Sequence, residues 1–529
     1  MQTLCLHDQP NRKTRRGEYS VPKIAAFLLA ALLAAGALTG CSSGETEPDG
    51  EQKAPAVTSA DTPAAETEPP VETEPERKPD LPDVTFDGYR FRIYAWNIDG
   101  WHTFEDLSVE DSAANALAES VYNRNLTIED QYDVKIDVIF EFYEDYYNNV
   151  IKNTKASEDY ADVTQSMGLS AGMLMSNGPF RNLLNLDAFE LDAPWWNHNA
   201  VEGMTINGYL PYCCSAVTLN DKAGVFCTFY NLDLAEIVGL RDNIYDVVHE
   251  GEWTIEKLRT YSEVTASDLN GNGQIDPETD RFGVTGNRTS ITAIFAGCGN
   301  RFVSVNEDDV PVSTFMTERT VDSLVTFLNG IMFQDNLYMN GSIVDIANIH
   351  INTFTEDRAL CLILCVTNGN SLREMESTYA IIPVPKLDPE QESYYAAVDM
   401  FTTYLTSLPI TLSTDAAERA AIIWEALSYE SYKRVLPVFY DTVIDYKLAR
   451  DAQSTEMLDI IFDSIVYDIG QIYNIESFAD DLTGLCGHMP SVQPRTTDVA
   501  SFYEKRRKVF EKSIDRFYTV CGKYREREE

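Results

Sequence analysis

The sequence predicts an α/β protein built on mostly parallel sheets. The chain has 529 residues, of which 44% are apolar and 11% aromatic, enough to fill the cores of two or three domains. Patterns typical of strands and helices then alternate along the first folded stretch. Such alternation favours parallel strands with helices on the faces of the sheet.

The folded region begins with an alternating apolar and polar strand at 89–96. A helix at 112–131 and a strand at 134–138 follow, and then a helix at 146–154 and a strand at 160–164. Farther on, the pattern predicts strands at 225–231 and 359–366, and helices at 254–262, 321–332, 416–430, 455–473 and 499–524. Thr254 is the expected N-cap of the helix that it begins.

The N-terminus predicts export. Five basic residues precede an apolar run at 24–38, which is too short to span a membrane comfortably and suits a signal peptide over 1–40. The run ends in Leu38-Thr39-Gly40-Cys41, which resembles the lipobox of bacterial lipoproteins. We expect cleavage before Cys41 and lipidation of its thiol, which would hold the protein on the extracellular face of the cell membrane. An ordinary secretory signal with a chance cysteine is the alternative.

An acidic segment rich in Pro, Glu and Thr follows at 41–83 and is predicted to be a disordered tether. The whole chain carries 41 Lys and Arg against 84 Asp and Glu, a net charge of −43. Such a charge repels nucleic acid and anionic lipid headgroups, so we expect no nucleic-acid partner.

The ten cysteines form no Cys-x-x-Cys pair, and the six histidines are scattered along the chain. Both observations argue against a zinc site. Cys213 and Cys214, and likewise Cys361 and Cys365, lie in apolar stretches. Buried free thiols are favoured over disulfides there.

A loop with the spacing of a calcium site follows the helix at 254–262. Oxygen side chains stand at loop positions 1, 3, 5, 7 and 9, with glycine at position 6: Asp268, Asn270, Asn272, Gln274 and Asp276. Position 12 is Thr279 in place of the usual glutamate. A structural calcium site and a metal-free turn both remain open, and no cofactor is required.

Gly168-Leu169-Ser170-Ala171-Gly172 follows a predicted strand and matches the G-x-S-x-G pattern of serine hydrolases. No histidine downstream has a recognisable triad context, so a loop at the edge of a cleft is the favoured interpretation.

Trp96, Trp101, Trp195 and Trp196 stand in loops or at strand ends, where an indole ring could stack on a sugar or pack in the core.

Taken together, several stretches resemble the extracellular solute-binding lipoproteins of ABC importers, in particular the carbohydrate-type branch related to solute-binding protein family 1. The stretches are Val121-Tyr122-Asn123-Arg124-Asn125, Pro194-Trp195-Trp196-Asn197, Phe229-Tyr230-Asn231, Gly251-Glu252-Trp253-Thr254 with Arg281-Phe282-Gly283, Ile382-Pro383-Val384-Pro385-Lys386, Leu427-Ser428-Tyr429-Glu430-Ser431-Tyr432 and Met457-Leu458-Asp459-Ile460-Ile461-Phe462-Asp463. Their order from lipobox to C-terminus, rather than any one of them, carries the resemblance.

The resemblance implies a two-lobed, type II periplasmic-binding-protein-like fold, each lobe a mixed but mostly parallel sheet flanked by helices, with the ligand in the cleft between them. The expected lobe 1 is 84–218 with 367–408, and lobe 2 is 219–366 with 409–529. The chain would cross between lobes near Thr218, Val366 and Pro409.

Cleft-facing strand ends hold the ligand in such folds. The candidate ligand-binding residues are Trp96, Asn97, Gln165, Ser166, Asp221, Asn287, Asn368 and Asn370. The implied protein is a monomer without catalytic activity, which binds an oligosaccharide or similar polyhydroxylated solute by lobe closure and delivers it to the transmembrane subunits of an ABC permease. A secreted serine hydrolase using Ser170 is the rival hypothesis, and a lipoprotein of this fold that docks another protein is a third.

Overall fold

The computed structural model describes residues 77–97, 105–307, 310–334, 336–340, 348–444, 452–478, 482 and 496–528. The predicted signal peptide and Cys41 lie outside the described residues, all of which belong to one compact unit, Pro75–Glu529. Arg77 at its start pairs with Glu190 at 2.7 Å and with Asp192 at 3.0 Å. The end of the predicted tether is therefore attached to the folded unit.

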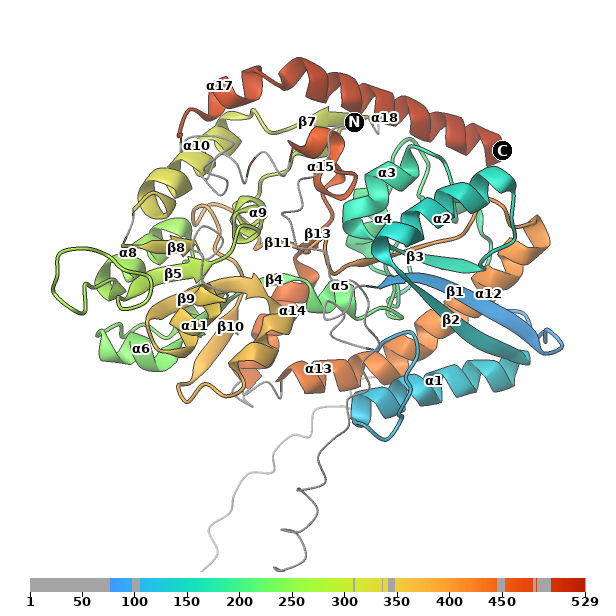
Figure 1. Ribbon diagram of the computed structural model, residues 1–529, viewed down its shortest axis with the longest axis horizontal. Helices are drawn as coiled ribbons and strands as arrows, with labels where there is room; N and C mark the ends of the chain where they lie inside the picture. The colour runs from blue at the N-terminus through green and yellow to red at the C-terminus, as the bar shows by residue number, and fades with distance from the viewer. Residues whose placement is uncertain are drawn as a thin grey trace, which may run out of the picture. The chain divides into compact units, whose positions relative to one another are not determined.

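Lobe 1 contains a four-stranded sheet in the order β12-β3-β1-β2 (Figure 1). β1 (Tyr89–Asn97) runs parallel to β2 (Val134–Phe142) on one side and to β3 (Val163–Met167) on the other. β12 (Tyr404–Ser407) is antiparallel to β3. The crossover helices are α1 (Ala116–Tyr132) and α2 (Tyr143–Ala156), which confirms the alternation predicted from the sequence.

Lobe 2 repeats this plan in a five-stranded sheet, β10-β4-β9-β5-β8. β5 (Phe282–Gly286) is parallel to β8 (Tyr338–Asn340) and to β9 (Ala359–Cys365). β4 (Phe226–Asn231) is antiparallel to β9 and to β10 (Tyr379–Ile382). In both lobes, three parallel strands are therefore followed by an antiparallel one. This topology confirms the predicted two-lobed fold with mixed, mostly parallel sheets.

The remaining elements cover the sheets or connect them. They are α3 (Ala171–Met175), α4 (His198–Met204), α6 (Leu232–Ile237), α7 (Ile244–His249), α8 (Ile255–Thr265), α9 (Ser290–Gly297), β6 (Val303–Val305), β7 (Pro311–Ser313), α10 (Glu318–Phe327), α11 (Ile349–Thr355) and α13 (Leu436–Ile444). Thr254 caps α8 as predicted, because its side chain accepts a hydrogen bond from the backbone N–H of Lys257.

Segments that connect the lobes lie between the sheets. One contains α5 (Asn220–Ala223), and another contains β11 (Ala396–Ala397), which pairs in parallel with β13 (Ile465–Val466). The helix predicted at 455–473 is therefore interrupted. α14 (Ala452–Asp463) ends before β13, and α15 (Ile469–Ile472) begins after it, because pairing with β11 holds Ile465 and Val466 in an extended conformation.

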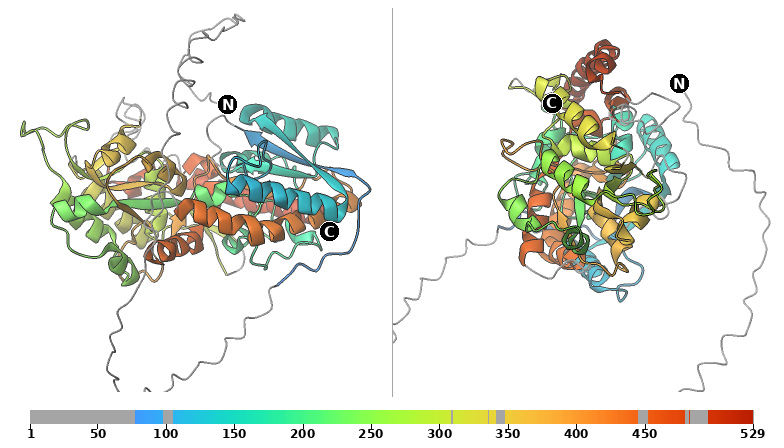
Figure 2. Two further views of the ribbon diagram at one scale, coloured as in Figure 1. Left: turned by 90° about the horizontal axis from the view of Figure 1, so that it is seen from below. Right: turned by 90° about the vertical axis from the view of Figure 1, so that its left-hand side faces the viewer.

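The predicted lobe boundaries differ from the structure in two places. β10 pairs with β4 and so belongs to the sheet of lobe 2, whereas the sequence predicts 367–408 in lobe 1. α12 (Thr414–Glu430) packs beside α1 in lobe 1 (Figure 2), whereas the sequence predicts it in lobe 2. β10 is buried at every position, and α12 has one buried face. Either lobe could bury such an element, so the local pattern does not indicate which lobe each element joins.

The C-terminal helices connect the two lobes a further time. α17 (Val499–Glu504) precedes α18 (Arg507–Glu528), the dark red helix along the top of Figure 1. α18 contacts β7 of lobe 2, and at its other end the Tyr524 hydroxyl donates to the Ser176 carbonyl of lobe 1 at 3.3 Å. The Glu528 carboxylate also accepts the backbone N–H of Asn182 at 2.9 Å.

Candidate functional site

A cavity lies at the carboxyl ends of the parallel strands of lobe 2, where open α/β sheets bind ligands. It has a volume of about 490 Å³ and adjoins a smaller cavity of about 60 Å³, with which it shares Phe226, Arg288, Thr289, Asp399 and Phe401. We call the two together the cleft pocket. The smaller cavity is also lined by Leu169, which follows β3 in lobe 1, so the cleft pocket reaches both lobes.

Three predicted ligand residues meet in the cleft pocket: Asn287, Asn368 and Asn370. Asn287 follows β5 directly, and the two other amides lie in the turn after β9. Two of these amides also shape the backbone. The Asn287 side-chain oxygen accepts the backbone N–H of Thr289 at 2.9 Å, and the Asn368 oxygen accepts that of Cys365 at 3.1 Å. Half-buried amides held in this way present polar atoms at fixed positions.

Further polar and aromatic residues of the pocket were not predicted from the sequence. Arg288 and Thr289 follow Asn287, and a wider definition of the strand end would have included them. Asp399, Phe401 and Thr402 come from the segment between β11 and β12, which no local signal marks as a ligand site. The additional residues of the smaller cavity include Thr292, Gln471 and Asn474.

Arg288, Phe401 and Asp399 form the charged part of the pocket. The guanidinium of Arg288 lies over the Phe401 ring, 5.4 Å from its centroid. Asp399 accepts the backbone N–H of Phe401 at 2.9 Å. Burial raises the pKa of the Asp399 carboxyl, while the nearby Arg288 charge acts in the opposite direction. The pocket thus combines an aromatic ring, a cation, a carboxyl group, amides and hydroxyls.

Four of the other predicted ligand residues are buried. Trp96 is 0% exposed and packs edge-on against Tyr404, with ring centroids 5.6 Å apart. The Gln165 amide donates to Thr406 Oγ1 at 3.0 Å, and the Ser166 hydroxyl bonds the Tyr146 hydroxyl at 3.0 Å. These groups join neighbouring elements of lobe 1. Asn97 is half-buried at the end of β1, while the loop after it, with Trp101, lies outside the described residues.

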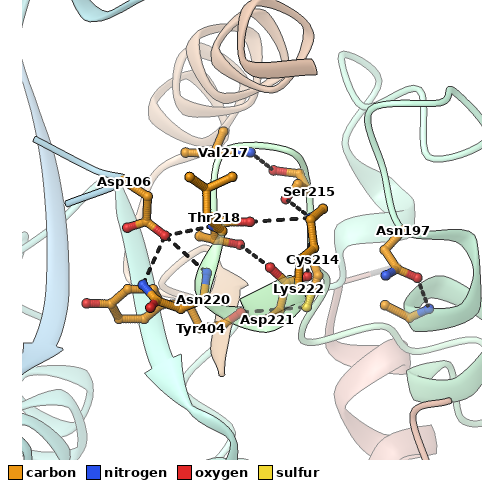
Figure 3. A network of polar contacts seen from close by, with 12 residues as sticks. Asp106, Asn197, Cys214, Ser215, Val217, Thr218, Asn220, Asp221, Lys222 and Tyr404 are labelled. Carbon is orange, nitrogen blue, oxygen red and sulfur yellow. Dashed lines mark hydrogen bonds and ion pairs between the residues drawn. The ribbon is translucent and has the colours of Figure 1, made fainter. Parts of the chain in front are cut away.

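The fourth buried residue, Asp221, belongs to a polar network where the chain passes between lobes (Figure 3). Its carboxylate lies 3.4 Å from Lys222 Nζ and accepts the Tyr467 hydroxyl at 3.4 Å. Asp106 lies close by and accepts the backbone N–H of Leu219 at 2.7 Å. Burial raises the pKa of Asp106 to about 6. These bonds attach lobe 1 to the segment that holds α5.

Arg124 completes this network from α1. Its buried guanidinium donates to the Asp106 carbonyl at 2.8 Å and to the Ser431 hydroxyl at 3.1 Å. Burial lowers the pKa of Arg124 to about 10, against the favourable charge of Asp106.

Trp195 and Trp196 are core residues held by one carboxyl group. Their indole N–H groups donate to Glu425 Oε1 and Oε2 at 2.6 and 2.8 Å, and all three side chains are buried. Burial raises the pKa of the Glu425 carboxyl to about 7. Packing in the core, one of the two predicted roles, is the one these indoles have here.

Ser170 lies between β3 and α3, in the strand-to-helix turn that the sequence predicts. Its buried hydroxyl donates to the Met167 carbonyl at 2.7 Å. His198 bonds the Ala193 carbonyl and His249 pairs with Glu456, so neither histidine serves Ser170. This geometry gives no support to the hydrolase hypothesis.

In the predicted calcium loop, side-chain oxygens accept backbone N–H groups. Asp268 accepts those of Gly271 and Gly273 at 2.6 and 2.7 Å, and buried Asp280 accepts those of Leu269 and Asp276 at 3.0 and 2.8 Å. Asn270 and Asn272 accept those of Asn272 and Gln274. Within the described ranges, no three His, Cys, Asp or Glu side chains form a group that could hold a metal ion. Calcium binding here stays a prediction.

Cys213, Cys214, Cys361 and Cys365 are buried free thiols, as favoured from the sequence. Cys227, Cys298 and Cys521 are also buried free thiols in the described part of the chain. No helix among the described residues is long and apolar enough to cross a membrane.

Comparison with known proteins places the fold. No protein-family model and no curated protein matches the chain by sequence. Among solved structures, it resembles an ABC substrate-binding protein of Listeria monocytogenes in complex with cycloalternan, at 12% identity and a TM-score of 0.51 over 82% of this chain and 100% of that one. It also resembles the cyclic α-maltosyl-1,6-maltose binding protein of Arthrobacter globiformis, at 10% identity and a TM-score of 0.53 over 82% and 100% of the two chains.

The sugar-binding protein MalE of Xanthomonas citri is similar as well, at 11% identity and a TM-score of 0.52, covering 82% of this chain and 98% of that one. The chain therefore has the two-lobed, type II binding-protein fold predicted from its sequence.

Proposed function

We propose that this two-lobed protein is the solute-binding component of an ABC importer, and that it binds an oligosaccharide or similar polyhydroxylated solute without catalysing a reaction. The observation that carries the proposal is the cleft pocket, which lies between the lobes and combines amides and hydroxyls with an aromatic ring. The similar structures are sugar-binding and substrate-binding proteins by description, which supports this choice.

The pocket suits a sugar for chemical reasons. Asn287, Asn368 and Asn370 offer both donors and acceptors, so each can bond a hydroxyl group. Phe401, whose ring also stacks with the Arg288 guanidinium, provides an apolar surface for a sugar ring. Rotation of the lobes about their connecting segments would enclose the solute and remove it from water.

The proposal includes the cellular setting predicted from the sequence. Lipid on Cys41 would anchor the protein at the extracellular face of the cell membrane, and the tether would let the loaded protein reach the transmembrane subunits of the permease. Metabolic labelling with a palmitate analogue tests the anchor, because a Cys41→Ser chain should take up none.

Ligand binding is tested by calorimetry against mono- and oligosaccharides, amino acids and short peptides. We expect one glycan class to bind, and Asn368→Ala or Phe401→Ala to weaken it about tenfold, since each lost contact is worth about 1.4 kcal/mol. The matched control is Asn177→Ala, whose exposed amide bonds the Met173 carbonyl on α3. The proposal fails when no saccharide binds, or when the control variant weakens binding as much as the pocket variants.

A further inference from the structure

A second cavity, of about 740 Å³, shares no lining residue with the cleft pocket. Its walls include α4 of lobe 1 through Asn199 and Glu202, the end of α7 of lobe 2 through His249, and Arg301 before β6. Tyr394 and Tyr395 line it from the segment before β11. We call this cavity the tyrosine groove. Its volume lies within the range of about 300–1,000 Å³ that is usual for small-molecule sites.

The two tyrosine rings are held in place. The Tyr394 hydroxyl donates to the Val248 carbonyl at 3.0 Å, and Lys386 Nζ lies 5.3 Å from the centre of its ring. The guanidinium of Arg301 lies 4.7 Å from the centre of the Tyr395 ring. A rigid aromatic wall loses little conformational entropy when a flat ligand packs against it.

Arg301 has more donors than the protein uses. A guanidinium carries five N–H groups, and the hydrogen bond that Arg301 makes within the described chain joins Nη1 to the Asn300 carbonyl at 2.7 Å. The buried carboxylate of Asp468 also lines the groove and attracts the Arg301 charge, while it accepts the backbone N–H groups of Phe302, Val303 and Gly470 at 2.5, 3.3 and 2.7 Å. Among the described residues, Arg301 thus keeps N–H groups that make no hydrogen bond to the protein and can reach a ligand in the groove.

This combination selects a ligand chemistry. A guanidinium fork matches a carboxylate or a phosphate, and the ring beside it suits a sugar. The hydroxyls of Ser304, Ser393 and Ser464 also line the groove and can bond sugar hydroxyls. Glu202 and Asp463 are exposed in the same lining, where water screens their repulsion of an anion.

We propose that the tyrosine groove is a second binding site, for an acidic mono- or disaccharide whose carboxylate or phosphate pairs with Arg301 while its ring packs on Tyr395. Because both lobes line the groove, an occupant contacts both moving bodies. A consequence that rests on the proposed function follows: the groove ligand changes the affinity of the cleft for its solute, and the solute changes the affinity of the groove equally.

The test is calorimetry with three probes: glucuronate, glucose 6-phosphate and neutral glucose. We expect at least one anionic sugar to bind wild-type protein, and to bind more weakly as sodium chloride rises from 50 to 300 mM. Arg301→Gln should weaken it at least tenfold and Arg301→Lys less, because lysine keeps the charge but not the fork. The two anionic arms distinguish a carboxylate from a phosphate ligand.

Two further variants separate this site from the cleft and from misfolding. Asn368→Ala in the cleft pocket should leave binding of the anionic sugar unchanged. If thermal unfolding shows that Arg301→Gln does not fold, Tyr395→Leu gives the deciding result, with the same tenfold loss expected. The inference is overturned when neither anionic sugar binds at millimolar concentration, or when the groove variant that folds binds as well as wild type. Oligosaccharide binding that depends on Asn368 would then still stand, so the two proposals fail separately.

Discussion

Glu425→Gln should flatten the dependence of folding stability on pH. The Glu425 side chain is 0% exposed, accepts the indole N–H groups of Trp195 and Trp196, and has its pKa raised by burial from 4.5 to about 7. A carboxyl whose pKa is higher in the folded state stabilises the fold while it is protonated. Its contribution is therefore complete below pH 4.5 and is lost as the pH rises through 7.

The expected size follows from that difference in pKa. Each pKa unit corresponds to about 1.4 kcal/mol, so the Glu425 carboxyl should lower the free energy of unfolding by about 3 kcal/mol as the pH rises from below 4.5 to above 7. Glutamine does not titrate and removes this change. Its amide oxygen can accept one indole N–H, but its NH₂ group opposes the other, so at every pH the variant should be about 1–3 kcal/mol less stable than wild type with Glu425 protonated. The variant should therefore be clearly less stable at pH 4.5 and close to wild type at pH 8.

Urea unfolding between pH 4.5 and pH 8, followed by tryptophan fluorescence, measures both curves. Glu119→Gln makes the same chemical change on the exposed face of α1 and serves as the control for the loss of one carboxyl group. Parallel curves for wild type and Glu425→Gln would refute the reasoning, because they would show that this carboxyl titrates alike in the folded and unfolded states.

Three other predictions concern the same fold. Arg124→Met leaves the Asp106 carboxyl buried without its compensating charge, so it should lower the free energy of unfolding in urea by about 3–5 kcal/mol. A loss below about 1 kcal/mol would show that the Arg124 charge does not compensate the Asp106 carboxyl. Ser170→Ala removes one buried hydrogen bond and should cost about 1 kcal/mol without changing solute affinity; loss of an ester-hydrolysing activity in this variant would instead favour a hydrolase. Gly172→Ala would place its Cβ 1.9 Å from the Tyr473 carbonyl oxygen and so force α3 and α15 apart, which should lower the free energy of unfolding by about 3 kcal/mol; an unchanged melting temperature would show that these backbones separate at no cost.

The local patterns of the sequence predicted the elements at the start of lobe 1 and some of those in lobe 2. β1, β2, α1 and α2 occur where alternating and helical periodicities place them, and β9 coincides with the run of apolar residues before Val366. These predictions succeed because periodicity reports which face of an element is buried. The break between α14 and α15 was missed, because strand pairing of Ile465 with Ala396 depends on a segment far away in the chain.

The candidate site divides along the same line. Asn287, Asn368 and Asn370 line one pocket because parallel strands all end at one edge of the sheet, and this placement could be expected from the sequence; ligand binding by the three stays a prediction. Trp96 and Gln165 satisfy the same rule but are buried, since β12 packs beside β3 and takes their neighbourhood out of solvent. Which strand ends remain open is set by the segments that cross between the lobes.

The sequence by itself determined the α/β class, part of the order of elements and some of the strand ends from which a solute site can be built, because these depend on residues close together in the chain. Only the tertiary structure decided that α12 belongs to lobe 1 and β10 to lobe 2. It alone brought Asp399 and Phe401 to Arg288, and Arg301 to Tyr395. These pairings join residues about a hundred positions apart, and their energies arise from packing, burial and charge in the assembled fold rather than from any local pattern.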